Sequence, residues 1–370
     1  MGVFINFAVS QNACGTAHRP SADVRFLQTR EIFINFAFSS GISVIFRPIE
    51  GMQPIIDKID PALIAAELTP DRLLRHTNKG DNEIYVVDAF NAPNTMREIG
   101  RLREIAFREA GGGTGKECDI DEFDTMKKPC QQMIVWNPVE REIIGGYRFI
   151  LGKDIKVTDG VPGIATAHMF RFSEKFLREY LPETIELGRS FVAIDYQSTK
   201  EKPKAIYALD NLWDGLGALT VIHPEIKYLF GKVTMYPSYN RECRDMILGF
   251  MHKHFPDPDQ LVTPIDPLPS AAEMPEIQSR FDGTDYKEDF RILNHFIREH
   301  NLRIPPLVNS YMALSPTMRV MGTAINREFG DVEETGIFLK ISDIFEEKKL
   351  RHIGSYSENG GTNANTDHTI

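Results

Sequence analysis

Hydrophobic and polar residues follow two different periods along this 370-residue chain. Between Asn94 and Ala110 the apolar positions fall three to four residues apart, which predicts an amphipathic helix. The run from Glu83 to Phe90 is instead rich in β-branched and aromatic residues, which is typical of a strand. The runs 132–136 and 142–151 have the same character and flank a turn sequence, Asn137-Pro-Val-Glu140. We therefore expect these two runs to form a hairpin.

Similar patterns predict the other elements. Asp60-Pro-Ala and Thr69-Pro-Asp-Arg each place a capping residue before a proline, which is a typical start of a helix. Further helices are expected over residues 173–180, 204–221, 241–254 and 286–300, further strands over 184–194, 232–235, 307–314, 324–328 and 335–341, and a long loop over 256–275. Antiparallel strands early in the chain and crossover helices later predict an α/β (α+β) fold, with a mixed central sheet flanked by helices. This order does not suit a TIM barrel.

The two ends of the chain differ from this body. Residues 1–51 contain two similar apolar runs separated by turn-prone sequence, and orderly helix signals begin only at Met52. We expect residues 1–51 to be an N-terminal extension that is disordered or foreign to the native protein; the alternative is a hairpin packed on the body. Residues 52–350 form the expected folded domain, and residues 351–370 are expected to be a disordered tail.

Composition narrows the class of protein. An apolar fraction of 42% and a charged fraction of 25% are ordinary for a soluble globular chain. The formal net charge of −10 argues against nucleic-acid binding, because phosphates attract clustered Lys and Arg side chains. The spacing of the four cysteines fits no metal site, so we expect free thiols in a reducing compartment. They are Cys14, Cys118, Cys130 and Cys243. The sequence contains no run of 18 apolar residues, so no membrane span is predicted.

Three short blocks combine acidic residues and arginines in apolar surroundings. They are Glu117–Asp124, Gly145–Arg148 and Glu186–Phe191, and the last two each put an arginine inside a strand-like run. An unpaired charge out of water is very costly, so a buried arginine needs a carboxylate partner. The blocks therefore predict an internal network of arginines and acids. Such a network is either a structural tie or a site where proton transfer is tuned.

Several better-known motifs are incomplete in this sequence. Gly111–Glu117 is similar to a phosphate loop, but Ala110 stands where the first glycine is needed and Glu117 stands where a hydroxyl residue is needed. His252-Lys-His254 has no accompanying carboxylate–histidine pairing, so we expect no metal site. Ser190 lacks the Gly-x-Ser-x-Gly context of a serine hydrolase.

Taken in order, the acidic and arginine blocks resemble the acyl-homoserine-lactone synthases, which belong to the wider GNAT acyltransferase fold. Longer blocks are more similar to the hemolysin-like bacterial N-acyltransferases that make amino-acid lipids, such as ornithine-lipid and glycine-lipid synthases. These blocks are Ile185–Val192, Leu212–Leu216, Gly231–Met235 and Pro305–Tyr311. The resemblance runs from Met52 to Asp343 and implies a GNAT-like N-acyltransferase domain.

The resemblance also implies a reaction. A fatty acyl group, often 3-hydroxylated, arrives as a phosphopantetheine thioester on acyl carrier protein and passes to the α-amine of a small amino acid. Glycine is favoured as the acceptor and ornithine is the alternative, because the shared motifs do not select the amine. The family implies no bound cofactor and a cytoplasmic protein that can contact the inner membrane peripherally.

The resemblance and the chemistry together assign roles to residues. Glu186 is expected to act as a base or proton relay for the ammonium group. Asp121 and Asp124 are expected to bind arginines and shape the site; capping a turn is their alternative role. Arg148 is either such a structural tie or a substrate ligand. The catalytic candidates are Glu186, Arg189, Asp121 and Asp124, and the substrate-binding candidates are Arg103, Phe107, Arg148, Ser190 and Phe191.

Two geometric questions follow from these assignments. Glu186 and Arg189 are three apart on a predicted strand, so simple alternation puts them on opposite faces. A bulge or bend at Gly188 would bring both to one site. The apolar side chains expected to line an acyl channel are Phe107, Phe149, Met169, Phe170 and Phe191.

Two other classes of function stay open. An acetyl-CoA-dependent acetyltransferase would carry a Q/RxxGxG/A pyrophosphate loop at the start of a helix, and the sequence has none. A non-enzymatic lytic protein would need an amphipathic or insertable segment, and none stands out. For docking of an acidic carrier protein, the candidate cations are Lys200, Lys202, Lys204, Lys227, Lys232, Arg241 and Arg244.

Overall fold

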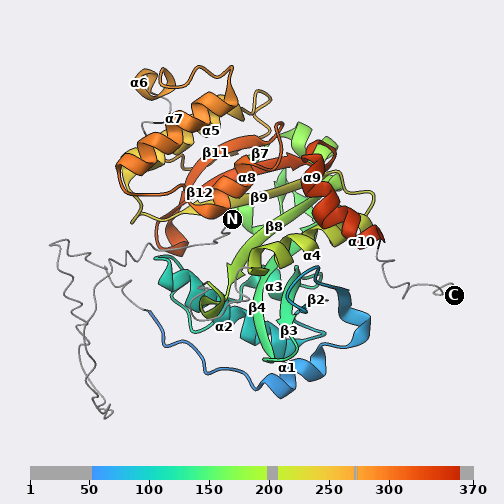
Figure 1. The fold of residues 1–370 in the computed structure, drawn as a ribbon. Helices are drawn as coiled ribbons and strands as arrows, with labels where there is room; N and C mark the ends of the chain where they lie inside the picture. Colours follow the sequence, from blue (N-terminus) through green and yellow to red (C-terminus); the bar gives the residue numbers. More distant parts are fainter. Residues whose placement is uncertain (1–51, 198–206, 271, 273, 359–370) are drawn as a thin grey trace, which may run out of the picture.

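An eight-stranded sheet forms the centre of the computed structural model, which describes residues 52–197, 207–270, 272 and 274–358 (Figure 1). The strand order is β1-β2-β3-β4-β8-β9-β12-β11. β8 and β9 are parallel, and the other neighbours are antiparallel. The strands are β1 (Leu73–His76), β2 (Glu83–Val87), β3 (Gln131–Asn137), β4 (Glu142–Leu151), β8 (Thr184–Val192), β9 (Tyr228–Met235), β11 (Arg319–Asn326) and β12 (Val332–Lys340). Two small ladders pair β5 (Val157–Thr158) with β6 (Val161–Pro162), and β7 (Phe170–Phe172) with β10 (Val262–Pro264).

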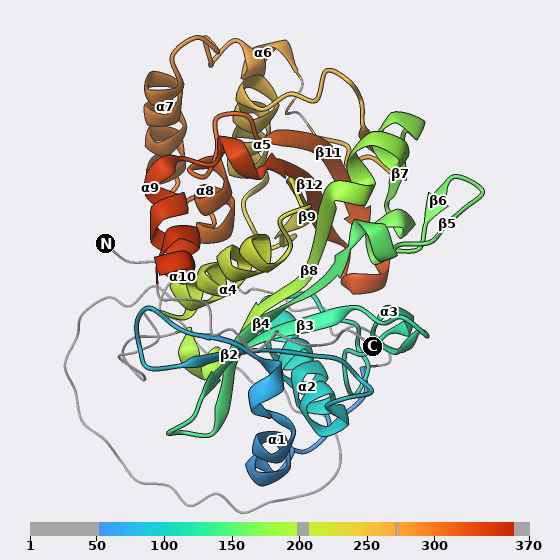
Figure 2. The same cartoon turned by 90° about the vertical axis from the view of Figure 1, so that its right-hand side faces the viewer.

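Helices cover both faces of this sheet, which confirms the expected mixed α/β architecture (Figures 1 and 2). α1 and α2 lie on one face, called here the α2 face. α4, α5, α7 and α8 lie on the other, called here the α4 face. The α-helices are α1 (Pro61–Glu67), α2 (Pro93–Glu109), α3 (Glu122–Thr125), α4 (Ala208–Ile222), α5 (Arg241–His254), α6 (Pro275–Gln278), α7 (Tyr286–Glu299), α8 (Pro306–Met312), α9 (Glu346–Lys349) and α10 (Ser355–Glu358).

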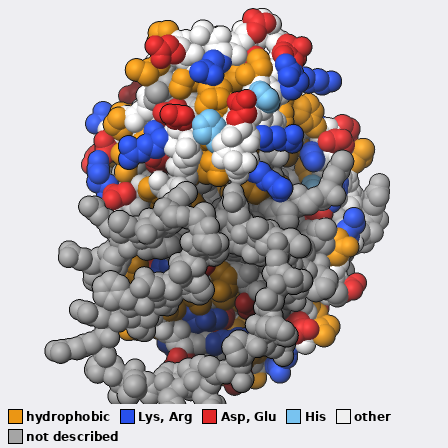
Figure 3. Space-filling model, turned by 60° about the vertical axis from the view of Figure 1, so that its left-hand side comes forward, with side chains coloured by type: hydrophobic (Ala, Val, Ile, Leu, Met, Phe, Trp, Pro, Cys, Tyr) orange, Lys and Arg blue, Asp and Glu red, His pale blue; other side chains and the backbone are white. Residues whose placement is uncertain are grey.

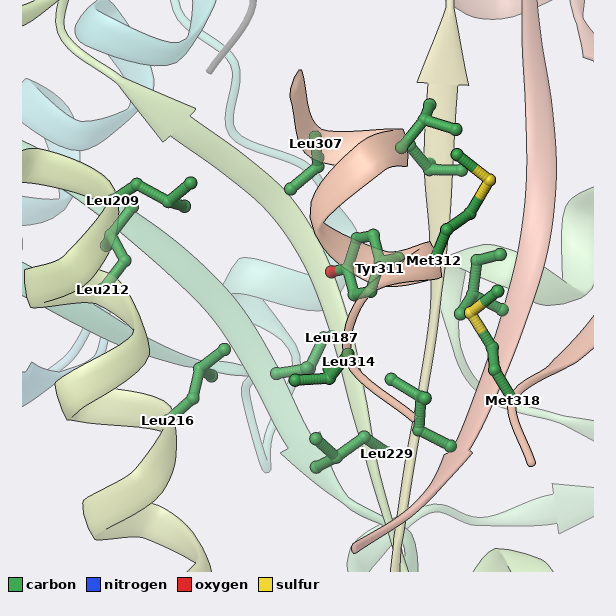
Figure 4. Close-up of a cluster of buried hydrophobic side chains, with 14 of the residues drawn as sticks. Leu187, Leu209, Leu212, Leu216, Leu229, Leu307, Tyr311, Met312, Leu314 and Met318 are labelled. Carbon is green, nitrogen blue, oxygen red and sulfur yellow. The ribbon is translucent and has the colours of Figure 1, made fainter. Parts of the chain in front are cut away.

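The core of the α4 face is a single large apolar cluster. Leu209, Leu212 and Leu216 of α4 point toward the sheet, where Leu187 of β8 meets them (Figure 4). Tyr311 of α8 packs into the same cluster, with its hydroxyl group directed toward the strands. The α2 face instead carries two smaller clusters. The charged groups described below lie on that α2 face, which is why its apolar packing is interrupted.

Local sequence explains where the helices begin. Asp60 accepts the N–H of Ala62 at the start of α1, and Asp285 accepts the N–H groups of Lys287 and Glu288 at the start of α7. α2 has a proline at its first position and takes its cap from another helix. The carboxylate of Glu67 accepts hydrogen bonds from the N–H groups of Asn94 and Thr95.

Some expected elements are wrong. Residues 307–314 were expected to be a strand, but Pro306–Met312 forms α8, because Pro306 fixes φ for a first helical turn and the apolar side chains share one helix face. The helix start at Thr69 gives only one 3₁₀ turn before β1, since the residues that follow pair with β2. The expected loop over residues 256–275 contains β10.

The expected disordered tail is also corrected in part. Leu350–Gly354 forms a π-helical turn and Ser355–Glu358 forms α10, against α4. His352 is buried there, and its Nδ1 lies 2.9 Å from Oδ1 of Asp214. A buried partner on α4 orders this segment in spite of its polar composition. Residues 359–370 and the N-terminal extension 1–51 lie outside the described residues, so the predictions about them stay predictions.

Candidate active site

A bulge in β8 decides which side chains share the α2 face. In the ladder with β4, Gly146 pairs with Phe191 and Arg148 pairs with Gly188, so β8 holds one extra residue. Arg189 lies in this interval with a φ of 47°, a left-handed conformation that side chains rarely adopt. The expected bulge therefore exists, one residue later than Gly188.

The bulge turns Arg189 to the α2 face. Its Nε lies 3.0 Å from Oδ2 of Asp119, and its Nη2 lies 3.5 Å from Oδ2 of Asp121. Its guanidinium also lies over the ring of Phe329, 4.7 Å from the centroid. Strain at a backbone position that the surroundings hold in place is common at functional sites, so this geometry supports a role for Arg189 in the site.

The predicted network of arginines and acids is present. Arg148 of β4 donates from Nη1 to both carboxylate oxygens of Asp121, at 2.6 and 2.7 Å. Asp124 lies 3.3 Å from Arg148 and 3.5 Å from Arg103. Arg103, on α2, is fully buried and also donates to the side chain of Gln132. Because Arg103 and Asp124 have no exposed side-chain surface, they support the site from within.

Both expected roles of the two aspartates occur together. Asp121 is the N-cap of α3 and accepts the N–H groups of Phe123 and Asp124. Asp124 accepts the N–H of Asp121 in return, which completes a capping box. The short helix thus fixes both carboxylates where the arginines reach them. Burial alone would raise the pKa of Asp121, but the adjacent Arg148 lowers it below the usual range, so Asp121 is an anion.

Glu186 differs from these paired acids. It is 3% exposed on the α2 face of β8, and it forms no ion pair within 4.0 Å with any described residue. Burial raises the pKa of Glu186, and the more distant Arg148 and Lys232 oppose that rise. Glu186 is therefore a buried carboxyl group whose pKa is shifted upward by burial, which is the direction that a general base requires.

Four further polar residues of this network were not among the catalytic or substrate-binding candidates, although Lys232 was a candidate docking cation. Asp119 belongs to the acidic block and is 1% exposed; burial raises its pKa. Gln132 opens a predicted strand and accepts the hydrogen bond from Arg103. Lys232 of β9 and Glu334 of β12 form a buried ion pair. The signal for Lys232 was a lone lysine between Phe230 and Val233, since a strand run of that kind is expected to be buried.

The sheet opens beside Glu186. β8 and β9 pair from Thr184 with Tyr228 as far as Leu187 with Gly231. Beyond that point β8 continues along β4 to Val192, and β9 continues along β12 to Met235. Backbone groups on the facing edges of the two strands therefore lie outside the described ladder. A Cβ added at Gly188 would find Nε of Arg148, 4.0 Å away, as its nearest neighbour, so there is space at this point.

The expected acyl-channel residues do not share one surface. Phe107 and Phe191 pack in the α2-face cluster that includes residues of α1 and α2. Phe107 also contacts Phe329, with ring centroids 5.1 Å apart. Met169 and Phe170 belong to a separate cluster of the same face. Phe149 lies in the core of the α4 face, because it alternates with Arg148 along β4. The expectation that all five side chains line a single acyl channel is therefore wrong.

Ser190 also lies apart from Glu186. The bulge directs its hydroxyl group toward Tyr147, which in turn meets the hydroxyl group of Tyr311, and both tyrosines belong to the α4-face core. Burial raises the pKa of both tyrosines, so both hydroxyl groups stay protonated at neutral pH. Arg189 and Ser190 are neighbours in sequence that serve opposite faces of the sheet.

Two of the expected docking cations are excluded by burial. Lys232 pairs with Glu334, and Arg244 pairs with Glu333 and Asp245, so neither presents its charge at the surface. Lys227 is exposed but paired with Glu183, and Lys200, Lys202 and Lys204 lie outside the described residues. In the upper part of Figure 3, Lys and Arg side chains are interspersed with Asp and Glu. That part of the surface is mixed in charge and has no basic patch.

The described residues hold neither a candidate metal centre nor a helix that could span a membrane. These residues contain no group of three His, Cys, Asp or Glu side chains placed to hold a metal ion. Cys118, Cys130 and Cys243 are free thiols, as expected. None of the described helices combines the length and the apolar character of a membrane span.

Comparisons with known proteins agree with this architecture. Residues 102–203 match the acetyltransferase (GNAT) domain. A glycine N(alpha)-acyltransferase from Bacteroides thetaiotaomicron is 59% identical over 308 residues, which cover 83% of this chain and 91% of that protein. A glycine N(alpha)-acyltransferase from Phocaeicola vulgatus is 58% identical over 306 residues, which cover 82% of this chain and 94% of that protein. No solved structure matches the chain. With relatives this similar over most of its length, the chain is an acyltransferase with a GNAT domain and belongs to the glycine N(alpha)-acyltransferase family.

Proposed function

We propose that this enzyme transfers a fatty acyl group, typically 3-hydroxylated, from acyl carrier protein to the α-amine of glycine. The names of the two relatives support glycine as the acceptor. The observation that carries the chemical part is the buried carboxyl group of Glu186, which forms no ion pair with a described residue and lies beside the opening between β8 and β9. The product would be an N-acyl amino acid, a step in amino-acid lipid synthesis.

The acceptor must lose a proton before it can attack. Glycine carries an ammonium group at neutral pH, and Glu186 would take a proton from it, directly or through one water molecule. The nitrogen then attacks the thioester carbonyl carbon and forms a C–N bond. The C–S bond breaks, and the second proton of the nitrogen passes to the thiolate, which leaves as the thiol. Burial raises the pKa of Glu186 toward the working pH, which brings its basicity closer to the task.

The developing oxyanion needs hydrogen-bond donors. The facing edges of β8 after Leu187 and β9 after Gly231 lie outside the described ladder, and N–H groups on these edges are suited to that task. Arg189 adds a positive charge beside them. It is held in place by Asp119 and Asp121, so it would need little rearrangement during the reaction.

Acyl carrier protein is the proposed donor. The absence of a Q/RxxGxG/A loop from the sequence favours a carrier-protein thioester over acetyl-CoA. An acyl carrier protein donor places the reaction in the cytoplasm, and a lipid product places it next to the inner membrane. Docking would rest on local cations, since the protein as a whole is acidic.

The test is a direct assay of donor and acceptor. The purified full chain is incubated with 3-hydroxyacyl carrier protein, the matching acyl-CoA or acetyl-CoA, and with glycine or ornithine, and products are identified by mass spectrometry. We expect N-(3-hydroxyacyl)glycine from the carrier-protein thioester, at a rate that falls with added salt. Product from ornithine alone would overturn the acceptor, and equal use of acyl-CoA without salt dependence would overturn the donor. Acetylation from acetyl-CoA alone would replace the proposal with an acetyltransferase.

A further inference from the structure

We propose that Lys232, together with Arg189, binds the carboxylate of the amino-acid acceptor while its ammonium group faces Glu186. This inference rests on the proposed function and makes Lys232 an acceptor-binding residue. It follows from the balance of charges in the network, from the exposure of each cation, and from the register of β8 and β9.

The charges of the buried network leave one acid without a partner. Three arginines face three aspartates, and Lys232 faces Glu334. Glu186 is the remaining carboxyl group, with no ion pair among the described residues. The paired acids and bases are Arg103, Arg148, Arg189, Asp119, Asp121 and Asp124. An ammonium group beside Glu186 would complete the balance, because a buried anion is stable only with a counter-charge.

Two of the four cations are less deeply buried than the others. The side chains of Arg189 and Lys232 are 15% and 12% exposed, whereas those of Arg103 and Arg148 are 0% and 3% exposed. Lys232 has three N–H donors, and its one described hydrogen bond is to Glu334. The remaining donors can meet an incoming carboxylate, and Glu334 holds the lysine in position to do so.

The register places Lys232 and Glu186 at a suitable separation. Glu186 pairs with Phe230, and Lys232 lies two residues further along β9 on the same face. Two residues of strand span about 6.6 Å and neighbouring strands lie about 4.8 Å apart, so the Cα atoms of Glu186 and Lys232 are about 8 Å apart, a separation that their side chains and a small α-amino acid can bridge. Gly188 follows the last paired residue of β8, as Lys232 does on β9, and a Cβ at Gly188 would have no heavy-atom neighbour nearer than 4.0 Å.

Burial also affects how strongly Lys232 would interact with a carboxylate. Desolvation lowers the pKa of Lys232, and the nearby Glu334 opposes that effect. A carboxylate from the acceptor would stabilise the charged lysine further. The same desolvated surroundings make a charge-assisted hydrogen bond stronger than it is in water.

The experiment compares acceptors that differ only in the carboxylate. Kinetics are measured for the wild type and for Lys232→Met, with 3-hydroxyacyl carrier protein as the donor and either glycine or glycinamide as the acceptor. We expect Lys232→Met to raise KM for glycine by about tenfold to a hundredfold, the range for losing one charged hydrogen bond. The preference for glycine over glycinamide should fall by a similar factor, while KM for the donor stays unchanged. Lys232→Arg should retain part of that preference.

Two controls separate binding from folding. Lys232→Met leaves Glu334 buried without a partner, so Lys232→Met with Glu334→Gln is made as a second variant that removes both charges. Lys340→Met, at an exposed lysine that ends β12, should change none of these constants.

The outcomes distinguish this inference from the function on which it rests. If the wild type makes no acylglycine from any donor, the proposed function fails. If the wild type makes it and the folded double variant keeps its KM for glycine and its preference over glycinamide, only the role of Lys232 fails. A lower kcat with an unchanged preference would likewise overturn acceptor binding by Lys232.

Discussion

Arg189 shares the α2 face of β8 with Glu186, although the two lie three positions apart along the strand, because Arg189 has a φ of 47° in a bulge. Without that extra residue the guanidinium would point into the apolar core of the α4 face. Instead it meets Asp119 and Asp121, and it stands beside the opening of the sheet. The bulge therefore builds the site by aligning a cation and a proton acceptor on one side of the sheet.

The first prediction concerns the chemistry of Glu186. Glu186→Gln keeps the size of the side chain but cannot accept a proton, so we expect kcat to fall by about 10²- to 10⁴-fold. Mass spectrometry of the product and circular dichroism of the protein would be measured together. A folded variant with near-normal turnover would exclude Glu186 as the base.

The second prediction concerns how Glu186 affects stability at different pH values. A carboxyl group with a raised pKa binds its proton more tightly in the folded state, so its contribution to stability is full below about pH 4.3, the usual Glu pKa. That contribution is lost as the pH rises through the folded pKa. Glu186→Gln has no such loss, and its unfolding free energy relative to the wild type should increase from acid to alkaline pH. Denaturant unfolding from pH 4.5 to 8.5 tests this, and parallel profiles would contradict it.

The third prediction uses the pair Arg189 and Asp119. Arg189→Ala leaves Asp119, which is 1% exposed, without its partner, so we expect a loss of about 3–5 kcal/mol in unfolding free energy. Adding Asp119→Asn removes the buried charge and should restore part of the loss. A double-mutant cycle by denaturant unfolding measures this coupling, and strictly additive losses would show that the pair is not coupled. Activity should stay low in both variants, because the cation is gone.

The fourth prediction compares two glycines at the opening. A Cβ at Gly188 would have 4.0 Å to its nearest neighbour, whereas a Cβ at Gly231 would lie 2.9 Å from the carbonyl oxygen of Leu187. Gly188→Ala should therefore fold like the wild type but lose activity if the acceptor occupies that space. Gly231→Ala should lower the melting temperature, because backbone atoms must move. A stable and fully active Gly188→Ala would place the acceptor elsewhere.

Much of this site could be predicted from sequence, because a charged residue within an apolar run is easy to recognise as one that will be buried. Arg148 and Glu186 stand in apolar strands, and such residues demand partners, which is why the arginine–acid network was expected from the three blocks. The hairpin of β3 and β4 followed from its turn sequence. The bulge was expected only because Glu186 and Arg189 had to share one face of the strand. No sequence pattern predicts an arginine in the left-handed conformation.

What sequence reasoning missed depends on long-range pairing. Lys232 gained its burial from β12, about a hundred residues later, and this placed Glu334 beside it. Pro306–Met312 has the β-branched and aromatic content of a strand, but tertiary packing on the α4 face favours a helix. The ordering of Leu350–Glu358 depends on an aspartate of α4, and no local pattern could reveal it.

The last prediction tests that C-terminal segment. Asp214 is 2% exposed and accepts hydrogen bonds from the N–H and the side-chain amide of Asn78, and His352 lies 2.9 Å away as a further partner. Removing a partner from a buried carboxylate costs about 1–3 kcal/mol, so His352→Ala should lower the unfolding free energy by that amount. Lys348→Ala, at a surface pair 4.0 Å long, is the matched control and should change it by less than about 0.5 kcal/mol. Because His352 packs against α4 on the opposite side of the sheet from Glu186, turnover at low temperature should be nearly that of the wild type in both variants. Equal stability of the His352→Ala variant and the control would show that residues 350–358 contribute little to holding α4 in place.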